Sequence, residues 1–177
     1  MYDETIDFDH RKELGVDGQD VKMDFLAPPQ ELLLLALLES SISEADGIIV
    51  VYNLLSRGTY DAALSRCRKL RTKFDSEELE VPILLLGVNI HNRDWTNTEI
   101  GKQEASKAAS DLQVPYCEAR LGQLYQDEND MKPIDEPFID MARMIRQAVE
   151  DYMEMKNHKT LAGAKRSKKL RKRAFRM

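Results

Sequence analysis

The chain has 177 residues, of which 42% are hydrophobic and 32% are charged, a composition that argues against a largely disordered protein. The length suits one domain with a short tail. The net charge of −5 hides an uneven distribution of charge along the chain. Residues 156–177 hold ten of the 26 basic residues and no acidic residue. Residues 1–155 therefore carry 16 basic and 31 acidic residues, a net charge of −15.

Several classes of protein do not fit this sequence. It has no apolar run of about eighteen residues and no N-terminal secretory signal, so we expect no transmembrane span. Cys67 and Cys117 lack the spacing of metal ligands or of a disulfide framework, which favours reduced thiols in the core over a nucleophile. The three histidines, His10, His91 and His158, share no ligand spacing, so we expect no metal site.

The first predicted elements form a hairpin. Residues 6–16 and 19–26 are predicted to be antiparallel strands joined by Asp17-Gly18, a dipeptide typical of tight hairpin turns. Pro28-Pro29 ends the second strand, and the leucine-rich residues 30–44 predict a helix. Leu32 and Leu33 begin a stretch that is richer in leucine than one helix face needs. Core packing and a partner-binding surface both remain possible explanations for it.

The rest of the chain alternates strands with helices. Residues 46–52, 81–86 and 114–118 are apolar enough for strands buried in a parallel sheet. Helices are predicted over residues 59–74, 96–112 and 137–155, and Thr96 and Glu99 have the spacing of a capping box. This alternation predicts an α/β layer fold with a mainly parallel sheet. Residues 156–177 are predicted to be a basic, disordered tail.

Five segments, in this order along the chain, resemble the Ras branch of small GTPases. Residues 2–6, Tyr-Asp-Glu-Thr-Ile, resemble its effector segment Tyr-Asp-Pro-Thr-Ile, and residues 23–26 followed by Gln30-Glu31 resemble Leu-Asp-Ile-Leu before Asp-Thr-Ala-Gly-Gln-Glu. Residues 11–18, 81–87 and 114–118 are similar to family strands and turns. The resemblance implies a three-layer P-loop NTPase-type fold. We expect it to lack the first strand, phosphate loop and first helix, because the effector-like segment begins beside Met1.

The resemblance also implies positions for magnesium and the γ-phosphate, and most of them are altered. Thr5 corresponds to the metal-binding threonine and Gln30 to the glutamine that orients the attacking water. The metal-linked aspartate and the phosphate-sensing glycine correspond to Ala27 and Pro29. Alanine cannot hold the magnesium shell, and proline has no N–H to donate.

The guanine-reading motif of the family, Asn-Lys-x-Asp, corresponds to Asn89, Ile90 and Asn92 with one inserted residue. An amide offers only one oxygen, so the paired hydrogen bonds to the base are lost. The sequence also contains no Gly-x-x-x-x-Gly-Lys-Ser/Thr motif. We therefore expect no catalytic residue and no GTP, GDP or magnesium cofactor, with Thr5, Gln30, Asn89 and Asn92 inherited but idle.

The main functional hypothesis is a protein-binding module in the cytoplasm that has lost the GTPase switch. Its predicted partner-binding residues are Tyr2, Asp3, Thr5, Ile6, Leu32 and Leu33. The alternative is a true GTP-hydrolysing GTPase, with GTP or GDP and Mg as cofactors, whose gene model lacks its N-terminus.

The tail ends without the C-terminal cysteine that prenylation needs. Its basic residues fit the anionic inner surface of a membrane, a nuclear import receptor or nucleic acid, the last being disfavoured by the acidic body. These residues are Lys165, Arg166, Lys168, Lys169, Arg171, Lys172, Arg173 and Arg176.

Sheet closure is a separate question. In the family the first strand lies between the hairpin and the strand that corresponds to residues 48–51, so its absence leaves unpaired backbone groups on both sides. Four explanations stay open at this point. The two halves close directly, the hairpin is loosely attached, a partner supplies a strand, or the start of the chain is wrong.

Overall fold

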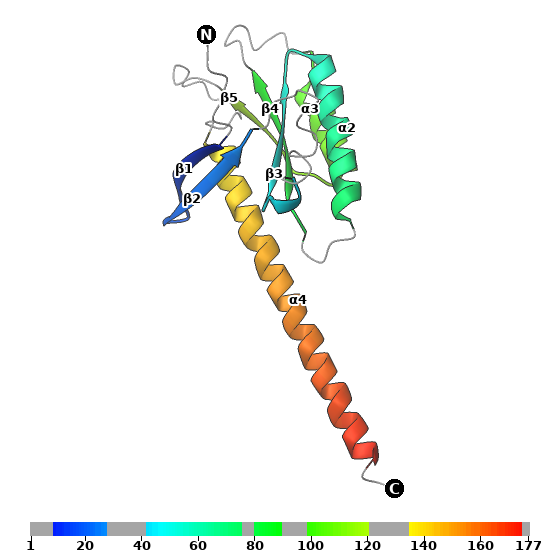
Figure 1. Ribbon diagram of the computed structural model, residues 1–177. Helices are drawn as coiled ribbons and strands as arrows, with labels where there is room; N and C mark the ends of the chain where they lie inside the picture. The colour runs from blue at the N-terminus through cyan, green and yellow to red at the C-terminus, as the bar shows by residue number, and fades with distance from the viewer. Residues whose placement is uncertain (1–8, 28–41, 76–79, 90–98, 121–134, 175–177) are drawn as a thin grey trace, which may run out of the picture.

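The computed structural model describes residues 9–27, 42–75, 80–89, 99–120 and 135–174, the last only as backbone from residue 158 onward (Figure 1). Its strands form two sheets, an antiparallel hairpin and a three-stranded parallel sheet. Two helices, α2 (Arg57–Phe74) and α3 (Lys102–Asp111), lie on one face of the parallel sheet. A third, α4 (Glu136–Ala174), extends away from the body. Within the described residues, no helix combines the length and apolarity needed to cross a bilayer.

The hairpin consists of β1 (Asp9–Val16) and β2 (Gln19–Leu26). Val16 pairs with Gln19, and both intervening residues have positive φ, 52° for Asp17 and 80° for Gly18. This is the two-residue turn whose twist suits a hairpin, so the predicted turn and the predicted second strand are confirmed. Residues 6–8 of the predicted first strand lie outside the described residues.

The parallel sheet has the order β3 (Ile48–Asn53), β4 (Ile83–Asn89) and β5 (Tyr116–Arg120). The mainly parallel α/β fold is therefore confirmed. The predicted strands 81–86 and 114–118 both begin and end too early. Pairing starts at Ile83 and Tyr116 and continues to Asn89 and Arg120. The hairpin does not belong to this sheet, so the two halves have not closed directly into one.

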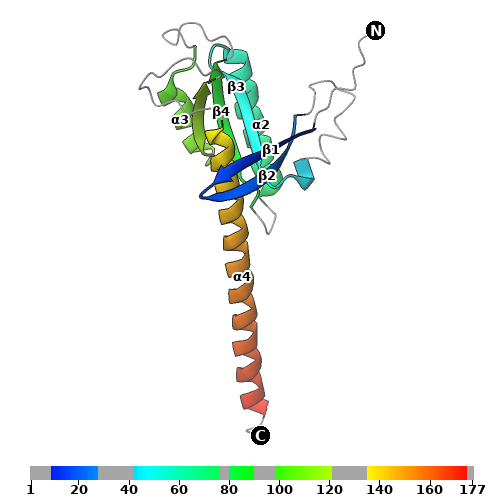
Figure 2. The same cartoon turned by 90° about the vertical axis from the view of Figure 1, so that its left-hand side faces the viewer.

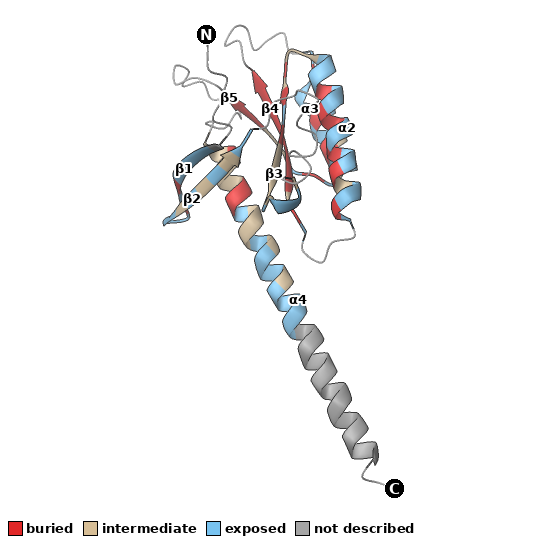
Figure 3. Ribbon diagram, in the orientation of Figure 1, coloured by how far each residue is buried: buried red, intermediate tan, exposed pale blue. Residues whose placement is uncertain are grey.

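The main core lies between the parallel sheet and its two helices (Figure 3). Ser56 caps α2 by accepting a hydrogen bond from the Thr59 N–H at 3.4 Å, and the helix buries one face at the spacing expected from the sequence. Cys67 lies on that face, and its burial raises its pKa to about 11. The thiol is therefore protonated at neutral pH and serves in packing.

The start of α3 differs from the sequence prediction. The helix begins at Lys102 with Gly101 as its N-cap residue and no side-chain cap, so the predicted start at residue 96 is wrong and Glu99 is not in the first turn of this helix, as the predicted capping box requires. Thr96 lies outside the described residues. The carboxylate of Glu99 instead accepts a hydrogen bond from the backbone N–H of Arg57, at 2.7 Å. A carboxylate at the start of a helix is stabilising in either place, and here it serves α2.

Helix α4 is longer than predicted. Residues 156–174 were expected to be disordered, whereas the structure continues the helix to Ala174. These residues are mostly Ala, Leu, Lys and Arg, all strong helix formers, and include no proline. The predicted helix over residues 30–44 lies mostly outside the described residues, and its described part, 42–44, is helical.

The hairpin packs against the first turns of helix α4. Leu14 and Val16 of β1 pack with Ala142, and Phe138 and Ile139 complete this second cluster from the first turns of the helix, together with the half-buried Val21 and Met23 of β2. The rings of Phe25 and Phe138 meet edge to face, with centroids 4.9 Å apart. Beyond its own two strands, the hairpin makes its most extensive described contact with this helix.

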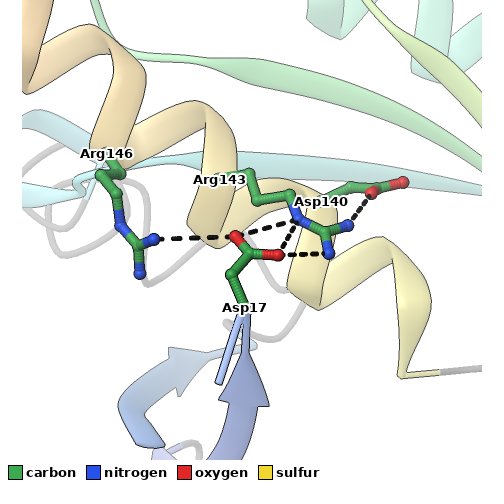
Figure 4. A network of polar contacts seen from close by, with 4 residues as sticks. All are labelled: Asp17, Asp140, Arg143 and Arg146. Atoms are coloured by element: carbon green, nitrogen blue, oxygen red, sulfur yellow. Dashed lines mark hydrogen bonds and ion pairs between the residues drawn. The ribbon is translucent and has the colours of Figure 1, made fainter. Parts of the chain in front are cut away.

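The hairpin turn is fixed to the same helix by charge (Figure 4). The Asp17 carboxylate accepts a hydrogen bond from Nη2 of Arg143 at 2.7 Å, and Nη1 of Arg146 lies 3.6 Å from its other oxygen. Arg143 is also paired with Asp140 at 3.3 Å. The hydrogen bond from Arg143 lowers the pKa of Asp17 below its usual value of 3.8. The ionised carboxylate therefore stabilises the docked hairpin above that pH, and its contribution is lost as the pH falls below it.

We predict that Asp17→Asn loosens the hairpin without unfolding the protein. Asparagine tolerates the left-handed backbone of this turn but cannot form the ion pairs. The amides of Leu14 and Val21 should exchange with deuterium a few-fold faster at about pH 6. The difference from wild type should shrink as the pH falls below the usual pKa of 3.8 and through the lowered pKa of the docked carboxylate. Asp20→Asn removes a charge from the exposed face of β2 and is the matched control. Equal exchange in wild type and Asp17→Asn would contradict the anchoring role.

Gly87 in the middle of β4 leaves room for neighbouring side chains. A Cβ atom at this position would lie 2.9 Å from both the Tyr52 hydroxyl and Cδ2 of Leu54. Both neighbours are buried, so neither can move away easily.

We predict that Gly87→Ala lowers the free energy of unfolding by about 1 to 3 kcal/mol through overpacking. Gly58→Ala is the control, because a Cβ at Gly58, in the first turn of α2, meets nothing within 4 Å. Alanine there should be neutral or stabilising by up to about 1 kcal/mol. Urea denaturation of the two variants measures both effects, and an unchanged midpoint for Gly87→Ala would refute the packing argument.

Candidate functional site at the carboxyl end of the parallel sheet

Open parallel sheets bind ligands beyond the carboxyl ends of their strands. The last strand residues here are Asn53, Asn89 and Arg120. Asn89 is directly opposite Arg120, and Asn53 is opposite Val88, so the three strand ends meet at one edge of the sheet. This edge is therefore the candidate functional site.

Asn53 holds the turn between β3 and α2 through its backbone and its side-chain oxygen. Its side-chain oxygen accepts the N–H of Leu55 at 3.1 Å, and its own N–H donates to the hydroxyl of Thr59 at 3.1 Å. Its carbonyl accepts the N–H of Ser56 at 3.0 Å. These bonds position the start of α2 and occupy the side-chain oxygen of Asn53.

The start of α2 has two features that bind phosphate in other proteins, a helix N-terminus and an arginine. Both are occupied here by carboxylates of the same chain. The backbone N–H of Arg57 donates to Glu99, and its guanidinium pairs with Glu104, with one contact at 3.1 Å, while lying 5.5 Å from the centre of the Tyr60 ring. The pairing lowers the pKa of Glu104 and raises that of Arg57. This corner is electrostatically satisfied without an added anion.

A buried polar cluster lies beside this edge. The Tyr52 hydroxyl passes over Gly87 to within 3.2 Å of the Tyr116 hydroxyl, and Tyr116 donates a hydrogen bond to the carboxylate of Glu118, which is only 9% exposed. Burial raises the pKa of both phenols, which are therefore neutral at physiological pH. The bond from Tyr116 compensates for burying a carboxylate.

Sequence reasoning did not identify this cluster. Its visible signals are the two-residue spacing of Tyr116 and Glu118, which places both on one face of a strand, and a glycine within a buried strand. Tyr52 comes from a strand far away in the chain, so only the sheet register shows that the three residues meet.

Asn89 is the one described residue among the four predicted nucleotide-site positions, Thr5, Gln30, Asn89 and Asn92. It ends β4 and is completely buried. Ala27, at the position of the metal-linked aspartate, directly follows β2 and is exposed. The remaining predicted residues, Tyr2, Asp3, Thr5, Ile6, Gln30, Leu32, Leu33, Asn92 and Arg176, lie outside the described residues. The other basic tail residues lie within α4.

Two comparisons with known proteins agree on the family. A sequence model of the Ras family matches residues 1–147. The chain is also similar to Ras-like protein 1 of Saccharomyces cerevisiae, with 23% identity over 154 residues. That match covers 87% of this chain and 46% of the yeast protein, so the chain spans less than half the length of this relative. Because the family match extends over most of the sequence, we conclude that the chain belongs to the Ras family.

Proposed function

We propose that this Ras family chain has lost guanine nucleotide switching and acts as a protein-binding module. The observation that carries the proposal is a set of replacements inside the chain, at Ala27, Pro29 and Asn92. None of them depends on where the sequence begins. Each removes a group that would contact magnesium, the γ-phosphate or the base.

The described chemistry at the carboxyl end of the sheet supports this proposal. The N–H of Arg57 and its guanidinium are both engaged by acidic side chains of the same chain. A nucleotide phosphate in this corner would have to displace these carboxylates and bear their repulsion. The polar groups of this edge therefore serve the stability of the domain better than they would serve a polyanionic ligand.

The proposed partner surface is connected to the hairpin at both ends. Tyr2, Asp3, Thr5 and Ile6 precede β1 in the chain, and Leu32 and Leu33 follow β2. Relatives in the Ras family meet protein effectors through the corresponding switch regions. Binding there needs no nucleotide chemistry, provided that the hairpin stays in place on α4.

We predict that the 177-residue protein does not bind fluorescent GTP or GDP analogues with micromolar affinity in the presence of magnesium. Each of the replacements at Ala27, Pro29 and Asn92 should remove at least one charge-assisted hydrogen bond or metal ligand that the nucleotide needs. Fluorescence anisotropy measures this, with a nucleotide-binding small GTPase as positive control. An Asn92→Asp variant restores the base-reading carboxylate alone and should also fail to bind. Stoichiometric, magnesium-dependent binding by the wild-type protein would overturn the proposal.

The alternative is GTP binding and hydrolysis by a longer form of the protein. The two separate sheets favour it, because in the family the first strand lies between the hairpin and the strand that corresponds to residues 48–51. Sequencing of transcripts upstream of Met1 distinguishes the cases. An in-frame Gly-x-x-x-x-Gly-Lys-Ser/Thr motif would support the longer GTPase, and Ala27, Pro29 and Asn92 would then have to be tested within it.

We also propose that the basic end of α4 binds anionic membrane surfaces. The sequence places nine of the ten tail cations between residues 156 and 173, within the helix. Each basic residue near an anionic leaflet contributes about 1 kcal/mol. The acidic body, with a net charge of −15 in residues 1–155, would face away from such a surface.

We predict that Lys168→Gln/Lys169→Gln/Arg173→Gln weakens binding to phosphatidylserine vesicles roughly a hundredfold, as expected for three such contacts. The control is Arg66→Gln/Arg68→Gln/Lys69→Gln, which removes three exposed charges from α2 and should bind like wild type. Co-sedimentation at about 0.1 M salt measures both. Equal loss in the two triple variants would show a response to net charge only, and binding of RNA instead of vesicles would favour a nucleic-acid partner.

A further inference from the structure

Helix α2 concentrates positive charge on a body that is otherwise strongly acidic. Its 18 residues include six basic residues and a single acidic one, Asp61. The rest of residues 1–155 holds 10 basic and 30 acidic residues, a net charge of −20. The exposed side of α2 lies on the outside of the body (Figure 3). The charge of this surface is therefore opposite to the charge of the body that carries it.

The last turn of α2 explains part of this charge. Arg71 pairs with Glu80 at 3.0 Å, and Lys73 donates a hydrogen bond to the Ser43 hydroxyl at 3.0 Å. Cations at the C-terminus of a helix also interact favourably with the helix dipole, an effect that is confined to the last turn. Both residues therefore have a structural role within the chain.

The three cations before the last turn have no such role. Arg66, Arg68 and Lys69 are all exposed, and none of them forms an ion pair with a described residue. Among the arginine side chains that the structure describes, Arg66 and Arg68 are the only two outside an ion pair. Like charges three or four residues apart on a helix repel, so Lys69 is unfavourable beside both Arg66 and Lys73. Helix stability does not account for this cluster.

The cations form a row with fixed spacing. Arg66, Lys69 and Lys73 lie on one ridge of the helix and span about 10 Å along its axis. Arg68 lies beside Lys69 on the neighbouring ridge of the exposed face. The opposite face of α2 is buried in the main core, so the backbone that carries the row is held rigidly.

We propose that this row binds an acidic helix of a partner protein, in which carboxylates repeat every three or four residues. A helix laid along the ridge has the same rise per residue, so its carboxylates would meet Arg66, Lys69 and Lys73 in turn. The guanidinium of Arg66 can hold a carboxylate through two parallel hydrogen bonds. This surface is distinct from the partner surface proposed beside the hairpin.

The surrounding charge selects a short acidic segment over a membrane or a nucleic acid. Asp61 and Asp75 are exposed near the two ends of the row. An extended polyanion would continue past them and approach the acidic body within a Debye length, about 8 Å at physiological salt. The basic end of α4 projects far from α2 in both Figure 1 and Figure 2, and residues 156–177 include no acidic residue. A lipid surface therefore fits that end better.

The first test compares two synthetic peptides on the full chain. Both are alanine-based helices with three glutamates, which stand at i, i+3 and i+7 in one peptide and consecutively in the other. Amide proton–nitrogen correlation spectra at about 0.1 M salt should show α2 signals that shift several-fold more with the spaced peptide. Signals from the basic end of α4 report binding that follows net charge alone.

The second test removes the row. Arg66→Gln/Arg68→Gln/Lys69→Gln should abolish the response of α2 to the spaced peptide. The variant should unfold at the same urea concentration as wild type or at a higher one, because no ion pair is lost and a repulsion is relieved. Lys168→Gln/Lys169→Gln/Arg173→Gln is the matched control, because it removes three charges from α4 and should leave the α2 response intact.

Three results would overturn the proposal. The first is the absence of any α2 response to the spaced peptide, and the second is an equal α2 response to both peptides. The third is an α2 response to soluble short-chain phosphatidylserine or to single-stranded RNA that is as strong as the response to the spaced peptide.

Discussion

The attachment of the hairpin to α4 is the constraint on which the rest of the structure depends. The two sheets share no described hydrogen-bonded strand, so their relative position must be set by side chains. One side of α4 packs on the hairpin through Phe138 and Ala142. Met141 and Ile145 approach Gly47, just before β3, so closely that a Cβ there would lie 2.5 Å from the Met141 sulfur. The helix therefore holds both halves, and Asp17 fixes the turn of one of them.

The sequence predicted local features better than long-range ones. The Asp17-Gly18 turn and the helix over residues 59–74 follow from the conformational preferences and periodicity of nearby residues, and both were correct. The capping box failed because Glu99 found a partner on a helix 42 residues away, where no local pattern could place it. The contact between Asp17 and Arg143 joins residues separated by 126 positions. Such contacts depend on the packing of whole elements.

The contrast between core and site explains why family membership and GTP binding must be judged from different residues. The strand Ile83–Asn89 is buried at every position, so packing restricts each residue to a narrow choice. Ala27 follows β2 and is exposed, so packing does not restrict the residue type there in the same way. Asn92 lies outside the described residues. The family match over residues 1–147 therefore reflects the residues of the core. Whether the chain binds GTP must be judged from the few altered residues.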